Sequence, residues 1–157
     1  DMLEVGNGMS ENEDRAHFSV WCMLAAPLIA GNDIRKMSGA VRSILTNNEV
    51  IAVDQDKLGI EGFVYKIKDS VEIYVKPLSG NDWAICFLNR SATTKNISFK
   101  WKDEIINDTV FNRNLDAKKV NYKLRDLWQK LNYGDTGKPL KASVQSHDVL
   151  MLRLSEK

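Results

Sequence analysis

The 157-residue sequence predicts two fold classes in succession, α/β up to about residue 60 and an antiparallel β-sandwich beyond it. Two observations support this prediction. Apolar residues recur at helical spacing in the first part, whereas short runs of alternating apolar and polar residues dominate the second. Clusters of turn residues separate those runs at the short intervals that are typical of sandwiches.

The first predicted helix begins beside Ser10. Ser10 and Glu13 have the spacing of a capping box, in which each side chain bonds the backbone N–H of the other residue. An apolar stripe follows at helical spacing, and Pro27 ends the regular helix because it lacks a backbone N–H donor. The stripe consists of Phe18, Trp21, Cys22 and Ala25.

Short apolar segments lie on both sides of this helix. Residues 1–5 predict the end of a buried strand, and residues 28–30 predict a second strand that ends in a polar loop. Ser38 is the expected cap of a second helix, and residues 49–54 continue as a helix or a strand, between which periodicity does not decide. The order strand, helix, strand, helix indicates parallel neighbouring strands over residues 1–56.

About two such units bury too little surface to form a sheet of their own. The first part therefore needs a partner, and we expect self-association or pairing with an upstream segment. We also expect exposed apolar surface, including the stripe formed by Phe18, Trp21 and Ala25. The sequence opens in mid-element and without an initiator Met, which leads us to expect a fragment or a processed product.

The second part predicts six to eight short strands. Residues 83–88 are apolar throughout, which indicates a central strand, whereas residues 97–101 alternate and indicate a strand with one buried face. Turns are expected at residues 68–70, 77–82 and 134–139. The other expected strand segments are 64–67, 71–75, parts of 105–111 (Ile105, Ile106, Val110 and Phe111), 122–126 and 149–154.

Composition argues against several classes of function. The net charge is +1, from 22 basic and 21 acidic residues, so no basic excess suggests nucleic acid or an anionic membrane as a partner. The longest apolar stretch, residues 20–30, is too short to span a bilayer. Cys22 and Cys86 are expected to be two unpaired core cysteines, with a pair of buried thiols as the alternative.

Several motifs follow one another along nearly the whole chain, and in this order they resemble the C-terminal part of the melibiase-type α-galactosidases, glycoside hydrolase family 27. The motifs of the first part are Asp1-Met2-Leu3-Glu4-Val5-Gly6-Asn7-Gly8, Trp21-Cys22-Met23-Leu24-Ala25-Ala26-Pro27-Leu28, Gly31-Asn32-Asp33-Ile34-Arg35 and Glu49-Val50-Ile51-Ala52-Val53-Asp54-Gln55-Asp56. Those of the second part are Pro77-Leu78-Ser79-Gly80, Leu88-Asn89-Arg90-Ser91, Arg125-Asp126-Leu127-Trp128 and Ser146-His147-Asp148-Val149.

The resemblance implies the C-terminal end of a (β/α)8 barrel, followed by an antiparallel β-sandwich. Residues 1–60 would hold the last βα units of the incomplete barrel, and residues 61–157 the sandwich. Relatives often have Gly-Asn-Gly-Gly-Met where this sequence has Gly6-Asn7-Gly8-Met9, which shortens the loop after strand seven by one residue.

The resemblance also implies retaining hydrolysis of terminal α-linked galactose from oligosaccharides. One aspartate attacks the anomeric carbon, and a second acts first as acid and then as base. In the family these aspartates lie on barrel strands four and six, upstream of the position of Asp1. No catalytic residue is therefore assigned in this chain, and the chain alone is expected to be inactive.

Asp1 and Met2 are the candidate substrate-binding residues. They match the Asp-Met pair that ends strand seven in the family and contacts galactose in the −1 subsite, and barrel active sites lie at the C-terminal ends of the strands. A carboxylate there can accept charge-assisted hydrogen bonds from two sugar hydroxyls, and a thioether offers an adaptable apolar wall. From the residues alone, Asp1 is a terminal surface acid.

Other polar residues have a structural interpretation that we favour. Asn32 and Asp33 follow the second predicted strand, and a turn and helix-capping role is preferred to substrate contact. His17 is expected to be a packed or solvent-edge helix residue, and His147 a turn residue. The histidines and cysteines lack the spacing of metal ligands, so no metal and no cofactor is predicted.

A second group of candidates also receives a structural interpretation. Asp54 and Asp56 are expected to form a hydrogen-bonded connector between the two parts. Trp83, Trp101 and Trp128 are expected in the core rather than on a sugar-binding platform. Three sequons are attributed to chance: Asn89-Arg90-Ser91, Asn96-Ile97-Ser98 and Asn107-Asp108-Thr109.

The sequence is thus interpreted as part of an α-galactosidase with an α-galactoside oligosaccharide as substrate. Its expected partner is the upstream barrel segment or a second copy of the chain, with neither nucleic acid nor a membrane involved. The alternative from another class is a noncatalytic β-sandwich module, which binds carbohydrate or buttresses a barrel. Neither the preferred terminal sugar nor the cellular compartment is indicated.

Overall fold

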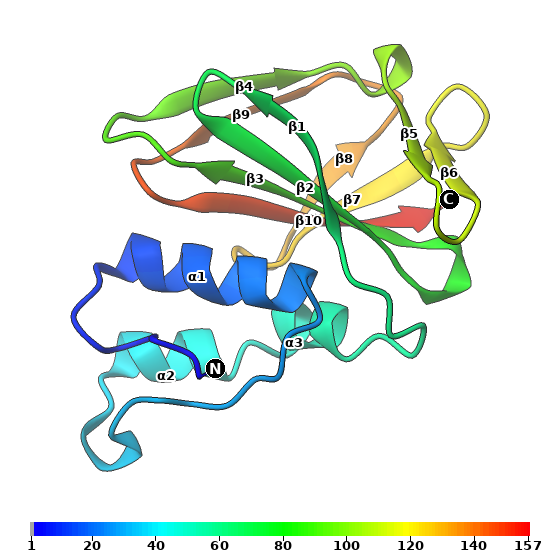
Figure 1. Ribbon diagram of the computed structural model, residues 1–157. Coiled ribbons are helices and arrows are strands. Elements are labelled where there is room, and N and C mark those ends of the chain that lie inside the picture. The colour runs from blue at the N-terminus through cyan, green and yellow to red at the C-terminus, as the bar shows by residue number, and fades with distance from the viewer. Residues whose placement is uncertain (1) are drawn as a thin grey trace.

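A computed structural model describes residues 2–157, and it consists of a helical layer packed against a β-sandwich (Figure 1). The helices, drawn in blue, cyan and blue-green, come from the first part of the chain and lie beneath the sheets of the second part in that view. The predicted fold class, α/β followed by an antiparallel β-sandwich, is confirmed.

The helical layer contains three α-helices. Helix α1 (Glu11–Met23) begins with the predicted capping box, in which the Ser10 hydroxyl accepts from the Glu13 N–H and the Glu13 carboxylate accepts from the Ser10 N–H at 2.8 Å. Helix α2 (Gly39–Leu45) is capped by Ser38 as predicted. Helix α3 (Asn48–Asp54) settles the open choice for residues 49–54 in favour of a helix. A 3-10 turn, η1 (Ile34–Lys36), precedes α2.

The two strands predicted in the first part are reduced to one parallel bridge between Leu3 and Ala30. The Leu3 N–H donates to the Ile29 carbonyl at 2.8 Å, and the Gly31 N–H donates to the Leu3 carbonyl at 3.1 Å. The parallel direction is therefore as predicted. Within residues 2–157, no other strand pairs with either segment.

The sandwich is built on a six-stranded antiparallel sheet in the order β1-β2-β3-β10-β7-β8. Two strand pairs, β4 with β9 and β5 with β6, cover its inner face. The strands of the large sheet are β1 (Phe63–Lys68), β2 (Val71–Pro77), β3 (Trp83–Asn89), β7 (Tyr122–Asp126), β8 (Leu131–Asp135) and β10 (Val149–Glu156); the pairs are β4 (Lys95–Phe99), β9 (Leu140–Val144), β5 (Ile105–Asp108) and β6 (Arg113–Asp116). Two 3-10 turns, η2 (Ser79–Asn81) and η3 (Trp101–Asp103), lie between strands.

The described residues form ten strands, so the prediction of six to eight was too low. Val110 and Phe111, expected in a strand, instead form the exposed turn between β5 and β6 because the Asp108 carboxylate accepts from both of their N–H groups. Gly134 and Asp135, expected in a turn, extend β8. Strand β4 ends at Phe99, and the following Trp101 reaches the core from η3.

The large sheet is buried on both faces where its central strands run. Along β3, the side chains of Trp83, Ile85 and Phe87 join the core inside the sandwich. Ala84 and Cys86 point the other way, into a second core shared with the helices. This explains why residues 83–88 are apolar throughout, as a strand with two covered faces requires. Both cysteines are buried and free, so the expectation of two unpaired core thiols is confirmed.

The expected exposure of the apolar stripe on α1 was wrong for Phe18. Phe18 is only 1% exposed, because the outer face of the large sheet covers it and its ring meets Trp128 edge-on with 6.4 Å between centroids. Trp21 and Ala25 are half-buried. The exposed apolar side chains of the first part are instead Met2, Leu24, Ile29, Ile34 and Leu58.

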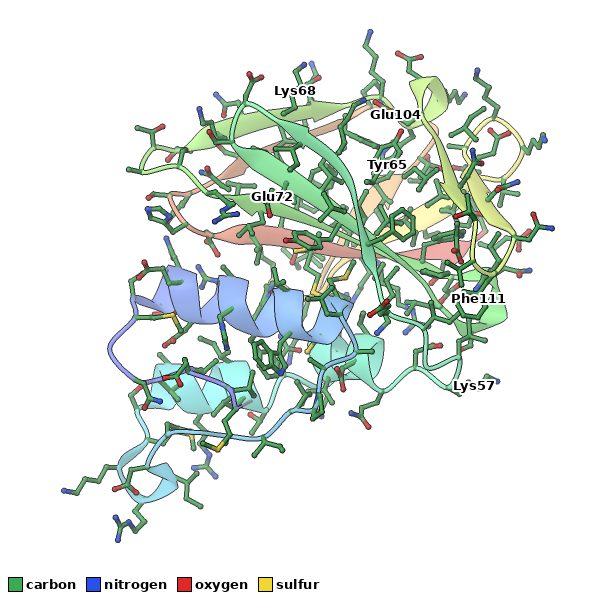
Figure 2. The ribbon with its side chains drawn as sticks, viewed as in Figure 1. Lys57, Tyr65, Lys68, Glu72, Glu104 and Phe111 are labelled. Atoms are coloured by element: carbon green, nitrogen blue, oxygen red, sulfur yellow. The ribbon has the colours of Figure 1, made fainter. Side chains whose placement is uncertain are left out.

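We predict that Phe18→Ala lowers the free energy of unfolding by about 3–5 kcal/mol, because it leaves a cavity between α1 and the sheet. The matched control is Phe111→Ala. Phe111 is 51% exposed on the β5–β6 turn, at the right-hand end of the molecule in Figure 2, and its loss should cost less than about 0.5 kcal/mol. Denaturant unfolding measures both values, and equal losses would contradict the burial of Phe18 in a shared core.

Candidate substrate-binding site

Of the two candidate residues, Met2 lies within the described residues and Asp1 lies outside them. Met2 directly precedes the parallel bridge at Leu3, and its side chain is 56% exposed. A thioether with this exposure next to a strand end is accessible to a ligand. The sequence-based assignment of both residues stays a prediction.

The second segment of the parallel bridge approaches Met2 closely. A Cβ atom on Gly31 would lie 2.7 Å from the Leu3 carbonyl oxygen and 3.4 Å from the Met2 Cβ. The first distance is shorter than a side chain tolerates, so only glycine allows the chain to pass at this point. The backbone at Gly31, just after the second predicted strand, therefore lies directly beside Met2.

The two polar residues after this glycine differ in their role. The Asp33 side chain accepts from the Arg35 N–H and forms an exposed ion pair with the Arg35 guanidinium, which confirms the expected capping role. Asn32 caps no helix. Its Oδ1 is buried and has no hydrogen-bond partner among residues 2–157, and its amide lies near Gly6. The Asn32 Oδ1 atom is therefore a hydrogen-bond acceptor without a partner among the described residues, and it lies near the segment that follows Met2.

Helix α1 holds the segment that follows Met2. The Nε2 atom of His17 accepts from the Glu4 N–H at 3.2 Å, and the buried Asp14 carboxylate accepts from the Gly6 N–H at 3.0 Å. Burial lowers the pKa of His17, in keeping with the neutral form that this acceptor role needs. This role of Asp14 was not predicted from the sequence, although Asp14 and His17 lie on one helix face at i, i+3 spacing.

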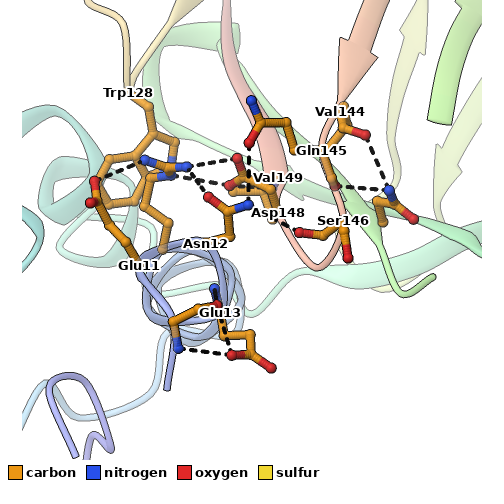
Figure 3. A network of polar contacts seen from close by, with 12 residues as sticks. Glu11, Asn12, Glu13, Trp128, Val144, Gln145, Ser146, Asp148 and Val149 are labelled. Atoms are coloured by element: carbon orange, nitrogen blue, oxygen red, sulfur yellow. Dashed lines mark hydrogen bonds and ion pairs between the residues drawn. The ribbon is translucent and has the colours of Figure 1, made fainter. Parts of the chain in front are cut away.

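Helix α1 is in turn attached to the sandwich by an ion pair (Figure 3). The Arg15 guanidinium donates to the Asp148 carboxylate through Nε at 3.1 Å and Nη2 at 2.7 Å, and Asp148 is 8% exposed. The side-chain amide of Asn12 donates to the Ser146 carbonyl at 3.1 Å. A bidentate pair fixes direction as well as distance, so the loop before β10 sets the position of α1.

Further polar contacts join the two parts on either side of this pair. The Lys76 ammonium, 1% exposed, donates to the Cys22 carbonyl at the end of α1 at 3.0 Å. Burial lowers the pKa of Lys76. Glu49 of α3 accepts from Arg125 of β7 through two hydrogen bonds of 2.9 and 2.7 Å. The helical layer is therefore fixed to the sheet at both ends.

The connector between the two parts contains the carboxylates that sequence analysis had singled out. Asp56 accepts from the Ser79 N–H at 3.0 Å, from the Ser79 hydroxyl at 2.8 Å and from the Leu58 N–H at 3.1 Å. Burial alone would raise the pKa of Asp56, but these hydrogen bonds outweigh it and the pKa is lowered. Asp54 accepts from the neighbouring Gln55 side chain, and burial raises its pKa. The expected connector role is confirmed for Asp56.

The remaining candidates form neither a tryptophan platform nor, among the described residues, a metal site. Trp83 and Trp101 are each 1% exposed, so no platform of three tryptophans forms, and Trp128 is half-buried with its indole N–H donating to the Ser19 hydroxyl. His147 lies in the turn before β10. Within the described part of the chain, no group of three or more His, Cys, Asp or Glu side chains is placed to hold a metal ion. No helix of residues 2–157 is long and apolar enough to cross a membrane.

Two family models match the chain. The model of the alpha galactosidase C-terminal beta sandwich domain matches residues 68–154, and the model of alpha galactosidase A matches residues 1–56. The chain is similar to alpha-galactosidase A of Cellvibrio japonicus, with 44% identity over 99% of this chain and 38% of that protein. It is also similar to an alpha-galactosidase of Coffea arabica, with 41% identity over 99% of this chain and 39% of that protein.

A solved structure agrees with these relatives. Alpha-galactosidase I from Mortierella vinacea superimposes with a TM-score of 0.84 at 30% identity, over 98% of this chain and 38% of that one. The chain thus spans less than two fifths of the length of these three relatives.

We predict that Arg15→Met lowers the free energy of unfolding by about 2–3 kcal/mol, because it leaves the Asp148 carboxylate buried without its partner. Arg35→Met is the matched control. It breaks an ion pair of similar geometry whose arginine side chain is 84% exposed, and it should cost less than about 1 kcal/mol. Chemical denaturation measures both variants. If Arg15→Met cost no more than Arg35→Met, the pair would not hold α1 in place.

A pH dependence follows from the contact between His17 and Glu4. Because the folded-state pKa of His17 lies below its usual value near 6.5, the unfolded chain binds this proton first as the pH falls. The contribution of His17 to stability is therefore present above about pH 6.5 and is lost as the pH falls toward the lower folded value. Between about pH 7.5 and about pH 5.5, the unfolding temperature should fall less in His17→Gln than in the unaltered chain.

His147→Gln is the matched control for this experiment, since it removes the other histidine, which lies in the turn before β10 and does not bond the Glu4 N–H. A His17→Gln variant that kept the full pH dependence of the unaltered chain would show that the imidazole does not act as a neutral acceptor.

Proposed function

Because the chain belongs to the melibiase-type α-galactosidases, glycoside hydrolase family 27, we propose that it is the C-terminal part of a retaining α-galactosidase. The parent enzyme would hydrolyse terminal α-linked galactose from oligosaccharides. The observation that carries this proposal is the parallel bridge between Leu3 and Ala30 with α1 connecting the two segments, which is the arrangement expected for adjacent strands of a (β/α)8 barrel.

In this proposal Asp1 and Met2 contribute to the −1 subsite. The Asp1 carboxylate accepts hydrogen bonds from two galactose hydroxyls, and the Met2 thioether packs against the apolar face of the sugar. The exposure of Met2 and the close passage of Gly31 beside it support this role, because a sugar needs an open wall at the strand end.

Catalysis is proposed to need residues from outside this chain. The family's nucleophile and its acid and base are aspartates on strands four and six, upstream of the motif that begins with Asp1. Residues 1–60 would complete the barrel made by the upstream segment, and residues 61–157 would form the terminal sandwich. The exposed apolar side chains of the first part support this pairing, because the missing strands and helices would cover them. Apart from Met2, which is proposed to contact the sugar, they are Leu24, Ile29, Ile34 and Leu58.

A chimera tests the proposal. The matching C-terminal segment of the Cellvibrio japonicus relative, about 38% of that protein, is replaced by residues 1–157, and turnover of a chromogenic α-galactoside is measured. The chimera should be active, and the isolated chain should not be. Asp1→Asn should lower kcat/KM roughly 10- to 100-fold, the cost of weakened hydrogen bonds to a charged group.

Met9→Ala is a matched control for Met2→Ala, because Met9 lies beyond the bridge on the loop that leads to α1. Met2→Ala should raise KM, and Met9→Ala should not. Turnover by the isolated chain would overturn the claim that the catalytic pair lies elsewhere. A folded, active chimera that Asp1→Asn leaves unchanged would overturn the subsite assignment.

A further inference from the structure

A cleft of about 350 Å³ lies between the helical layer and the edge of the sandwich. The starts of α1 and α2 form one side, and the other side consists of the β7–β8 turn, β8 and the segment from β9 to β10. Its volume is at the lower end of the range for small-molecule sites. The side chains that give it chemical character are Glu11, Ser43, Trp128, Gln129, Tyr133 and Gln145.

Trp128 is the most firmly held aromatic side chain of this cleft. Its indole N–H donates to the Ser19 hydroxyl at 2.9 Å, and its backbone N–H donates to the Asp126 carboxylate at 2.9 Å. The ring also meets Phe18 edge-on. An aromatic ring that is ordered before a ligand arrives costs little conformational entropy when it binds.

Several neutral hydrogen-bonding groups of the cleft are available to a ligand. Gln145 accepts through Oε1 from Asn12 at 3.4 Å, which leaves its amide hydrogens free to donate. The side chains of Gln129, Tyr133 and Ser43 have no hydrogen bond to any other residue of the described chain. Carboxamides and hydroxyls both donate and accept, as sugar hydroxyls do.

The charges around the cleft favour a neutral ligand over an anion. Glu11, Asp126 and Asp148 line it, and the single cation in its lining within residues 2–157 is Arg15. The Arg15 guanidinium is already bonded to Asp148, Asn12 and Glu11. A phosphate or carboxylate would therefore meet uncompensated negative charge, whereas a neutral polar molecule would not.

We propose that this cleft is a binding site for a neutral saccharide. The sugar would present its C–H face to the rings of Trp128 and Tyr133, and its hydroxyls to the carboxamides of Gln129 and Gln145 (Figure 3 shows Trp128 and Gln145 around Asp148). The lining includes neither Met2 nor Gly31, so this inference goes beyond the function proposed above.

The experiment is an NMR titration of the 15N-labelled chain with galactose and raffinose, with glucuronate as the anionic comparison. Both neutral sugars should produce saturable shift changes at the Trp128 indole N–H and at the side-chain amides of Gln129 and Gln145. The dissociation constant should be on the order of 1–10 mM, as expected for a small neutral ligand.

Tyr133→Ala and Gln129→Ala are the deciding variants, since both side chains are exposed and their loss should leave the fold intact. Each should weaken sugar binding at least about fivefold. Phe111→Ala, an exposed aromatic residue outside the cleft, is the matched control and should bind as the unaltered chain does. Trp128→Ala would also remove the contact with Phe18, so its effect on binding would not be confined to the cleft.

Four results would overturn the proposal. These are the absence of saturable shifts with either sugar, unchanged affinity in both deciding variants, binding of glucuronate as tight as that of galactose, and shift changes confined to the surroundings of Met2 and Gly31. The last result would support the proposed −1 subsite while contradicting the cleft, so the two proposals can fail separately.

Discussion

Burial of both faces of the large sheet is the constraint on which the rest of the structure depends. In β2, β3 and β10, alternate side chains pack into the sandwich or against the helices. The first part of the chain has one short parallel bridge to support its own strands, and its buried apolar side chains share one core with the outer face of the sheet. This shared core explains why Phe18 is covered.

The proposed substrate contact is linked to the sandwich through consecutive polar contacts on α1. Asp148 holds Arg15, and the residues of the same helix on either side, Asp14 and His17, hold the backbone that follows Met2. The sandwich thereby determines where the strand end lies. A buttressing role for the sandwich and a binding role for its edge cleft are compatible. Asp148 and Trp128 both bond to side chains of α1, and both also line the cleft.

Local physical chemistry explains both the successes and the errors of prediction. The capping box at Ser10 and the cap at Ser38 were predictable, since their hydrogen bonds join residues three positions apart. Val110 and Phe111 were misassigned because β propensity outweighed the turn signal of Asp108. Strand β8 was missed because it is a polar, exposed edge strand, and such a strand has no apolar period to detect.

The sequence by itself determined the succession of α/β units and sandwich strands, the helix starts, the central position of β3 and the family, because each depends on local pattern or on motif order. It also singled out Met2, and Asp1 with it, as the candidates for substrate contact. Only the tertiary structure decided that Phe18 lies in a shared core, that Asp14 and His17 hold the strand end, and that Trp128, Gln129 and Tyr133 line one cleft. These arrangements join residues up to about 130 positions apart, as Arg15 and Asp148 are, and no periodicity along the chain records such pairs.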